Sequence, residues 1–211
     1  MSETSSKRSR RTLWLLTLLV ITVVGISLIR KPASQNTPGV AGPLPDGVLS
    51  YTSADPELPV AFQYPSGWRI DEERGAVDVY HQVRLRGPRN QEDTYTAYLL
   101  VRSTPLHERD AAEGVRGFMT RYTSHLPEGA AIDSRAAQQL AGLTAEDLMV
   151  SYTIPPLHRA GRAPRAIPVR TRTLVAAKDG RLYEFVYSAD ARAYTDSAGA
   201  FERVSRTLQI R

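Results

Sequence analysis

The chain has 211 residues, a formal net charge of +5 and no cysteine. The lack of cysteine excludes disulfides, thiolate metal sites, cysteine nucleophiles and a lipid-acylated cysteine. Six of the 27 basic and one of the 22 acidic residues lie within residues 1–31, so the rest of the chain carries 21 of each. Since nucleic-acid binding needs basic residues clustered on the folded domain, we expect no nucleic-acid partner.

Residues 12–29 form an apolar stretch of eighteen residues without a charge. As a helix this stretch extends about 27 Å, close to the roughly 30 Å hydrocarbon core of a bilayer. A cleaved signal peptide is the alternative, but its apolar region is about 7–15 residues long and ends at a small-residue cleavage site. Because Arg30-Lys31-Pro32 is a poor cleavage context, we predict an uncleaved transmembrane helix.

The charges on either side of this helix predict its orientation. More basic residues precede it, in the tail 1–11, than follow it, so the positive-inside rule places the amino terminus in the cytoplasm. The remaining chain then lies on the extracytoplasmic side of the cell (inner) membrane as a single-pass protein. The predicted membrane-interface residues are Lys7, Arg8, Arg10, Arg11, Trp14, Arg30 and Lys31.

Residues 30–48 are rich in proline and glycine and have no hydrophobic periodicity, which predicts a semi-extended linker. The remaining residues, 49–211, are enough for one domain with a core of its own.

Alternating apolar residues between turn signals predict a strand-rich domain. The clearest signal is Asp179-Gly180, which supplies the positive φ angles of a two-residue hairpin turn. In the strand after this turn, Tyr183, Phe185 and Tyr187 share one face. The predicted strands are 60–64, 68–71, 77–86, 94–103, 132–139, 143–154, 167–178 and 181–188, with a closing apolar segment at 208–210.

Two stretches repeat apolar residues at helical spacing. Residues 108–126 do so with Met119 among them, and residues 191–205 direct Tyr194 and Phe201 toward the core. A methionine and aromatic stripe of this kind is more often core than cofactor site. Strands with two amphipathic helices predict an α+β sandwich around an antiparallel sheet.

Motifs at both ends of the domain resemble those of PsbP-like proteins, the superfamily of extrinsic photosystem subunits and Ran-binding Mog proteins. The opening strand, turn and Trp signature is carried by Phe62, Tyr64, Pro65, Gly67 and Trp68. Segments 179–183, 189–194, 201–204 and 207–208 are similar to that family's final hairpin and helix. Tyr194 stands where plant PsbP sequences tend to have Trp.

The resemblance covers roughly residues 49–211. It implies an α-β-α sandwich that serves as a binding and assembly module, without catalytic residues. The predicted membrane anchor departs from the soluble plant subunits and argues against a nuclear Ran-binding role.

Candidate catalytic and metal-binding residues are scattered. The four histidines are His81, His107, His125 and His158. Asp78 and His81 are three residues apart in a predicted strand and so face opposite sides. The acidic runs 71–73, 92–93 and 146–147 fall at turns or strand ends, which predicts solvated edges, with a weak calcium or manganese contact as the alternative. We find no nucleophile elbow and no phosphate-cradling glycine loop, and we predict no catalytic, cofactor or metal site.

Residues 155–168 form a proline-rich segment that is longer than most connections. Arg159, Arg162 and Arg165 lie within it, Arg170 and Arg172 follow, and no acidic residue comes before Asp179. One interpretation is a solvated loop. The other is that these five arginines form a partner-binding site for carboxylates or for anionic lipid headgroups.

The expected function is a non-catalytic accessory or assembly subunit. Its extracytoplasmic domain would dock on subunits of an integral membrane protein complex, with a photosynthetic reaction centre suggested by family analogy. The alternative is a solitary periplasmic ligand-binding or envelope-stress domain or, more remotely, a hydrolase.

Overall fold

The structure is a computed structural model that describes residues 41–44, 47–74, 80–91, 93–106, 113–156 and 165–211. The chain divides into two units, residues 1–36 and 37–211, and all the described residues belong to the second. Within these described ranges, no helix is long and apolar enough to span a bilayer. The predicted transmembrane stretch 12–29 and its seven predicted interface residues lie outside the described residues.

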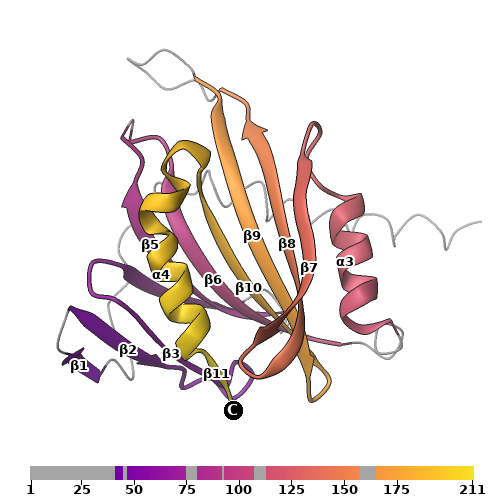
Figure 1. The fold of residues 1–211 in the computed structure, drawn as a ribbon. Coiled ribbons are helices and arrows are strands. Elements are labelled where there is room, and N and C mark those ends of the chain that lie inside the picture. The colour runs from indigo at the N-terminus through magenta and orange to yellow at the C-terminus, as the bar shows by residue number, and fades with distance from the viewer. Residues whose placement is uncertain (1–40, 45–46, 75–79, 92, 107–112, 157–164) are drawn as a thin grey trace, which may run out of the picture. The chain divides into compact units, whose positions relative to one another are not determined.

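All strand pairs are antiparallel and form two sheets (Figure 1). The larger sheet has the order β4-β5-β6-β10-β9-β8-β7 and the smaller one the order β1-β2-β3-β11. The large sheet contains β4 (Arg69–Arg74), β5 (His81–Arg89), β6 (Thr96–Pro105), β7 (Ala131–Leu140), β8 (Leu143–Ile154), β9 (Ile167–Lys178) and β10 (Arg181–Asp190). The small sheet contains β1 (Ala41–Leu44), β2 (Val48–Thr52), β3 (Val60–Pro65) and β11 (Gln209–Ile210).

In the described part of the chain, one α-helix packs on each face of the large sheet. Helix α3 (Gly114–Ser124) contacts β8 and β9, whereas α4 (Tyr194–Thr207) contacts β10 and β3 of the small sheet. Neighbouring strand residues point to opposite faces, and accordingly Leu174 belongs to the α4-side core while Val175 belongs to the α3-side core. The predicted α+β fold, an α-β-α sandwich around an antiparallel sheet, is confirmed.

The small sheet is the main difference from the predicted strands. β1 lies inside the segment 30–48 that we predicted to be a linker, and β2 was not predicted at all. β1 is short and contains Gly42 and Pro43, so it has no alternating pattern, and its pairing with β2 comes from the tertiary structure. Helix α3 runs from Gly114 to Ser124, inside the predicted range 108–126, of which residues 108–112 lie outside the described ranges.

The α4-side core is built from stacked aromatic rings. Phe185 on β10 and Phe201 on α4 have ring centroids 4.8 Å apart and planes inclined by 2°. The hydroxyl of Tyr187, on the same face of β10, donates to the backbone oxygen of Tyr194 at 2.6 Å. The predicted shared face of β10 and the predicted inward face of the last helix are therefore confirmed.

Candidate functional site

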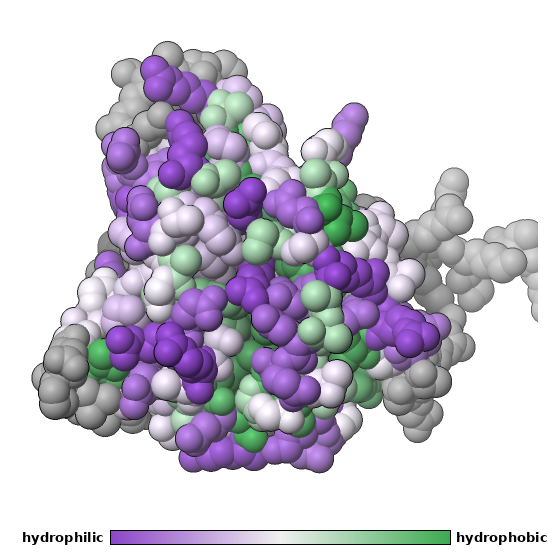
Figure 2. Space-filling model, viewed as in Figure 1, coloured by the Kyte–Doolittle hydropathy of each residue, from purple (hydrophilic) through white to green (hydrophobic). Residues whose placement is uncertain are grey.

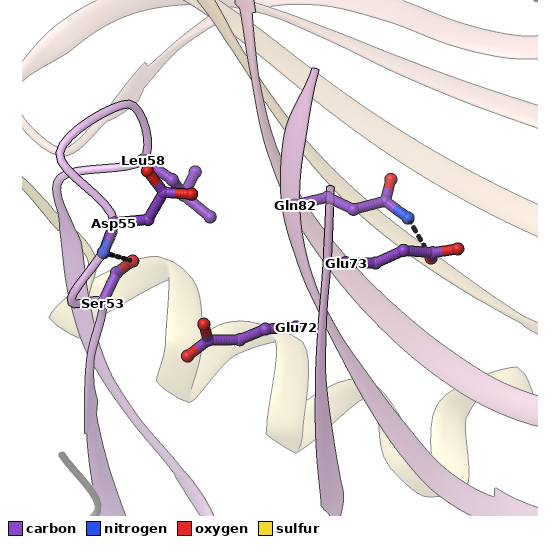
Figure 3. Close-up of a pocket in the computed structure, with 6 residues that line it drawn as sticks. All are labelled: Ser53, Asp55, Leu58, Glu72, Glu73 and Gln82. Atoms are coloured by element: carbon purple, nitrogen blue, oxygen red, sulfur yellow. Dashed lines mark hydrogen bonds between the residues drawn. The ribbon is translucent and has the colours of Figure 1, made fainter. Parts of the chain in front are cut away.

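A small pocket lies between the β2–β3 connection, the edge strand β4 and its neighbour β5 (Figure 3). Its volume is about 260 Å³, which is just below the roughly 300–1,000 Å³ of sites for drug-sized ligands. The residues that line it are Ser53, Asp55, Leu58, Glu72, Glu73 and Gln82. Because three of these are acidic, the pocket favours a small cationic group over an anion.

A buried Asp55–His81 pair connects the pocket wall to β5. Asp55 Oδ2 lies 2.7 Å from His81 Nδ1, and both residues are buried. The other oxygen, Oδ1, accepts from the backbone N–H of Glu57 at 3.0 Å. Asp78, the acidic residue considered beside His81 in the sequence, lies outside the described residues. The carboxylate that the structure places on His81 comes from 26 positions earlier. A pairing across this distance leaves no spacing signal in the sequence.

Glu72 and Glu73 on β4 are exposed, as predicted for a solvated edge, but each also has a protein partner. Figure 3 shows the two side chains pointing apart, as adjacent residues of a strand do. Glu72 accepts from the Tyr51 hydroxyl at 2.7 Å. Burial and this carboxylate raise the pKa of Tyr51 above its ordinary value. Glu73 accepts from Gln82 at 2.7 Å.

A row of polar side chains continues from the pocket across the α3 side of the sheet. The Gln82 amide donates to Glu73, and its oxygen accepts from Arg102 Nε at 3.0 Å and from Nη2 at 2.9 Å. Arg102 Nη1 lies 3.7 Å from the carboxylate of Glu184 on β10. Burial raises the pKa of Glu184. The row therefore runs from an acid through an amide and an arginine to a second acid. Its members satisfy one another's hydrogen bonds and charges, which is typical of a structural network.

In the described part of the chain, no group of three or more His, Asp or Glu side chains is placed to hold a metal ion. His125 is exposed, with Nδ1 2.7 Å from the backbone oxygen of Arg121. His107 and His158 lie outside the described residues.

Asp190, at the end of β10, is expected to make the domain less stable in acid. Its carboxylate accepts from Arg192 and Asn90, and chiefly the Arg192 bonds lower its pKa from 3.8 to about 2. A carboxyl group whose pKa is lower in the folded than in the unfolded state stabilises the fold at every pH above its unfolded-state pKa. This stabilisation is lost as the pH falls through the folded-state pKa, here from about pH 4 to pH 2. Asp190→Asn should remove about 2 kcal/mol at pH 7 and almost nothing near pH 2. Urea unfolding of the native chain and of Asp190→Asn between pH 7 and about pH 2 measures the difference in their free energies of unfolding. A difference that does not shrink in acid would contradict the stabilising role of the Asp190 carboxylate.

The predicted arginine site divides into two groups. Arg159 and Arg162 lie outside the described residues, and Arg165 is exposed just ahead of β9. Arg170 and Arg172 lie on β9 and pair with acidic residues of the same domain.

The contacts of these two β9 arginines are internal. Arg170 Nε lies 3.4 Å from Asp133 Oδ2. Arg172 Nη2 donates to Asp147 at 2.8 Å, and its guanidinium carbon lies 4.7 Å from the centroid of the Phe201 ring. In the sequence no acidic residue lies between Arg159 and Asp179, but the fold brings the earlier residues Asp133 and Asp147 within reach of β9.

The face seen in Figure 2 has hydrophobic residues scattered among hydrophilic ones rather than gathered into one area. Scattered apolar residues are normal on a folded domain. Hydropathy on this face therefore does not by itself mark a docking site.

No protein-family model and no curated protein matches the chain. Among solved structures, LpqN of Mycobacterium tuberculosis, involved in cell envelope biogenesis, matches with a TM-score of 0.50 and 17% identity over 77% of this chain and 90% of that chain. Cyanobacterial PsbP (CyanoP) from Synechocystis matches with a TM-score of 0.50 and 14% identity over 78% of this chain and 93% of that chain. The domain has a PsbP-like fold.

A third similar structure is larger than this chain. A protein from Bacteroides thetaiotaomicron matches with a TM-score of 0.47 and 13% identity over 77% of this chain. The chain spans about half of that protein, 48% of its length.

The motif residues that led to the PsbP resemblance have structural roles in this PsbP-like domain. Phe62 and Tyr64 are buried on β3. The ring of Trp68 lies so close to Gly87 that a Cβ there would be 2.6 Å from it. Asp179 and Gly180 have the positive φ angles, 49° and 72°, expected for the hairpin turn. These motifs therefore specify core packing and turns, and they carry no information about a catalytic site.

Proposed function

We propose that the chain is a non-catalytic accessory or assembly subunit, anchored by residues 12–29, whose extracytoplasmic PsbP-like domain docks on a larger membrane protein complex. The observation that carries this proposal is that a domain with a PsbP-like fold follows, after the proline- and glycine-rich segment 30–48, an uncharged stretch of eighteen residues. LpqN, which shares the fold, is involved in cell envelope biogenesis. A photosynthetic reaction centre is the complex that the PsbP resemblance suggests.

The docking contact is proposed to involve Arg159, Arg162 and Arg165. We place the contact on the three arginines of the long proline-rich segment 155–168. Arg170 and Arg172 bind carboxylates of their own domain. Guanidinium groups pair bidentately with carboxylates, so an acidic surface on the partner complex fits this segment. Anionic lipid headgroups offer similar chemistry and are the competing target.

Replacement of Arg159, Arg162 and Arg165 together by alanine is expected to abolish co-purification with the partner complex from mild detergent. The matched control replaces Arg116, Arg203 and Arg206, three exposed arginines on α3 and α4, and changes the net charge equally. The control is expected to retain the partner. Equal retention by both variants would contradict the proposed contact, and loss only of binding to anionic vesicles would indicate lipid as the target.

A solitary ligand-binding domain in the extracytoplasmic compartment is the second candidate. The acidic pocket at β4 and β5 favours it, because three carboxylates around about 260 Å³ can accept a small cation such as an amine. Native mass spectrometry of the purified chain separates the two candidates. A bound small cation without protein partners favours this alternative.

A further inference from the structure

Strand β7 has an unprotected free edge. Among the strands that the structure describes, it pairs only with β8 and lies at the end of the seven-stranded sheet. Its first nine residues, 131–139, are exposed. Ile132, 50% exposed, is the one large hydrophobic side chain that stands exposed in the described part of the chain. A free edge offers a row of backbone N–H and C=O groups to which another strand can bind.

The opposite edge of the same sheet is protected in the usual way. Five of the six residues of β4 are charged, and charged side chains on an edge strand discourage pairing with other chains. β7 is ten residues long, has no proline or lysine, and has only two charged residues, Asp133 and Arg135. Both are paired within the domain, Asp133 with Arg170 at 3.4 Å and Arg135 with Glu146 at 2.9 Å. The β7 edge therefore lacks the protection that β4 has.

The β7–β8 turn determines which backbone groups point outward. Ala141 and Gly142 have φ angles of 52° and 79°, so β7 and β8 are joined by a two-residue primed turn. The residues that flank such a turn, Leu140 and Leu143, are hydrogen-bonded to each other, and bonded and non-bonded pairs then alternate along the ladder. The register is regular from Ser134 to Leu140. Residues 135, 137 and 139 therefore direct their N–H and C=O groups away from β8.

We propose that β7 pairs antiparallel with β7 of a second copy of this chain, so that two seven-stranded sheets join across a two-fold axis. In such a contact the strand lies opposite itself. With the axis at Ala136 or Ala137, alanine faces alanine, and Arg135 faces the neutral residue 137 or 139. An axis at Arg135 would place two arginines opposite each other, which destabilises a strand pair. A two-fold axis at residue 136 or 137 therefore lets most of the two β7 strands overlap and places no two like charges opposite each other.

A cysteine scan tests this pairing, because the chain has no cysteine of its own. Single cysteines are placed at each of residues 134–139 of the full-length chain in membranes, followed by mild oxidation. Directly opposed Cβ atoms in a strand pair are about 4.5–5.5 Å apart, close to the geometry of a disulfide. We expect the yield of disulfide-linked dimer to be highest for Ala136→Cys or Ala137→Cys and to fall at Ser134→Cys and Gln139→Cys. The control is Thr144→Cys, an exposed position on β8, one strand in from the edge.

Three outcomes of the scan would overturn the proposal. They are dimer yields no higher than for Thr144→Cys, equal yields at all six positions, and cross-links to another protein in place of dimers. A second variant does not depend on oxidation. Ala137→Pro removes an outward N–H and should abolish self-association in sedimentation, with little loss of thermal stability because proline is tolerated on a free edge. Self-association that survives this variant would also overturn the proposal.

Discussion

Replacing Phe201 by alanine is expected to lower the free energy of unfolding by about 3–5 kcal/mol. Phe201 is 2% exposed. Its ring stacks on Phe185 of β10 and lies 5.7 Å from the ring of Tyr187. Alanine would lose these contacts and leave a cavity between α4 and the sheet, which the rigid β10 backbone is poorly able to fill. Urea unfolding followed by circular dichroism measures the change.

Phe118→Ala on α3 is the matched control for this prediction. Phe118 is only partly buried, and its ring stacks on Tyr122 with centroids 6.1 Å apart. Truncation there removes less buried apolar area and should cost less. If Phe201→Ala destabilised the domain no more than Phe118→Ala, α4 would not be held by the stacked core described above.

Arg172→Ala is expected to lower the free energy of unfolding by about 2–3 kcal/mol, below the range for fully buried pairs because the site is partly solvated. Arg172 donates to Asp147 through Nε and Nη2 at 2.8–3.1 Å, and it also contacts Gln138 and Glu202. Removing the arginine leaves the Asp147 carboxylate, 13% exposed, without its main partner.

A double-mutant cycle with Asp147→Ala measures this interaction directly. The double variant should be less destabilised than the sum of the two single variants, because neither charge is then left unpaired. Arg203→Ala, at an exposed position of α4, is the control and should change stability by no more than about 0.5 kcal/mol. Additive single effects would show that Arg172 does not stabilise the domain through Asp147.

The elements predicted correctly are those that local chemistry determines. The Asp179-Gly180 turn requires positive φ angles, and the amphipathic spacing of residues 191–205 marks the buried face of α4. The segment that contains β1 indicates a linker because it is rich in proline and glycine and has no hydrophobic periodicity. Its strand conformation depends on β2 as a partner, so its own sequence contains no signal for it.

The candidate site was much less predictable than the fold. The pocket brings residues 53–58 alongside 72–82, and that meeting depends on how the small sheet packs on the large one. The internal pairing of Arg172 likewise depends on the β8–β9 register. This register places Met149 opposite Arg172, and Asp147 two residues before Met149 on the same face of β8. Sequence proximity identified Arg172 as part of a basic segment, whereas cross-strand geometry makes it part of a structural ion pair.

Purification of the full-length chain from its native membranes in mild detergent, followed by mass spectrometry, tests the central claim most directly. The account predicts an intact amino terminus that includes residues 12–29, together with integral membrane proteins in fixed stoichiometry. A mature chain that begins beyond Lys31 and is recovered from the aqueous extracytoplasmic fraction without protein partners would contradict it.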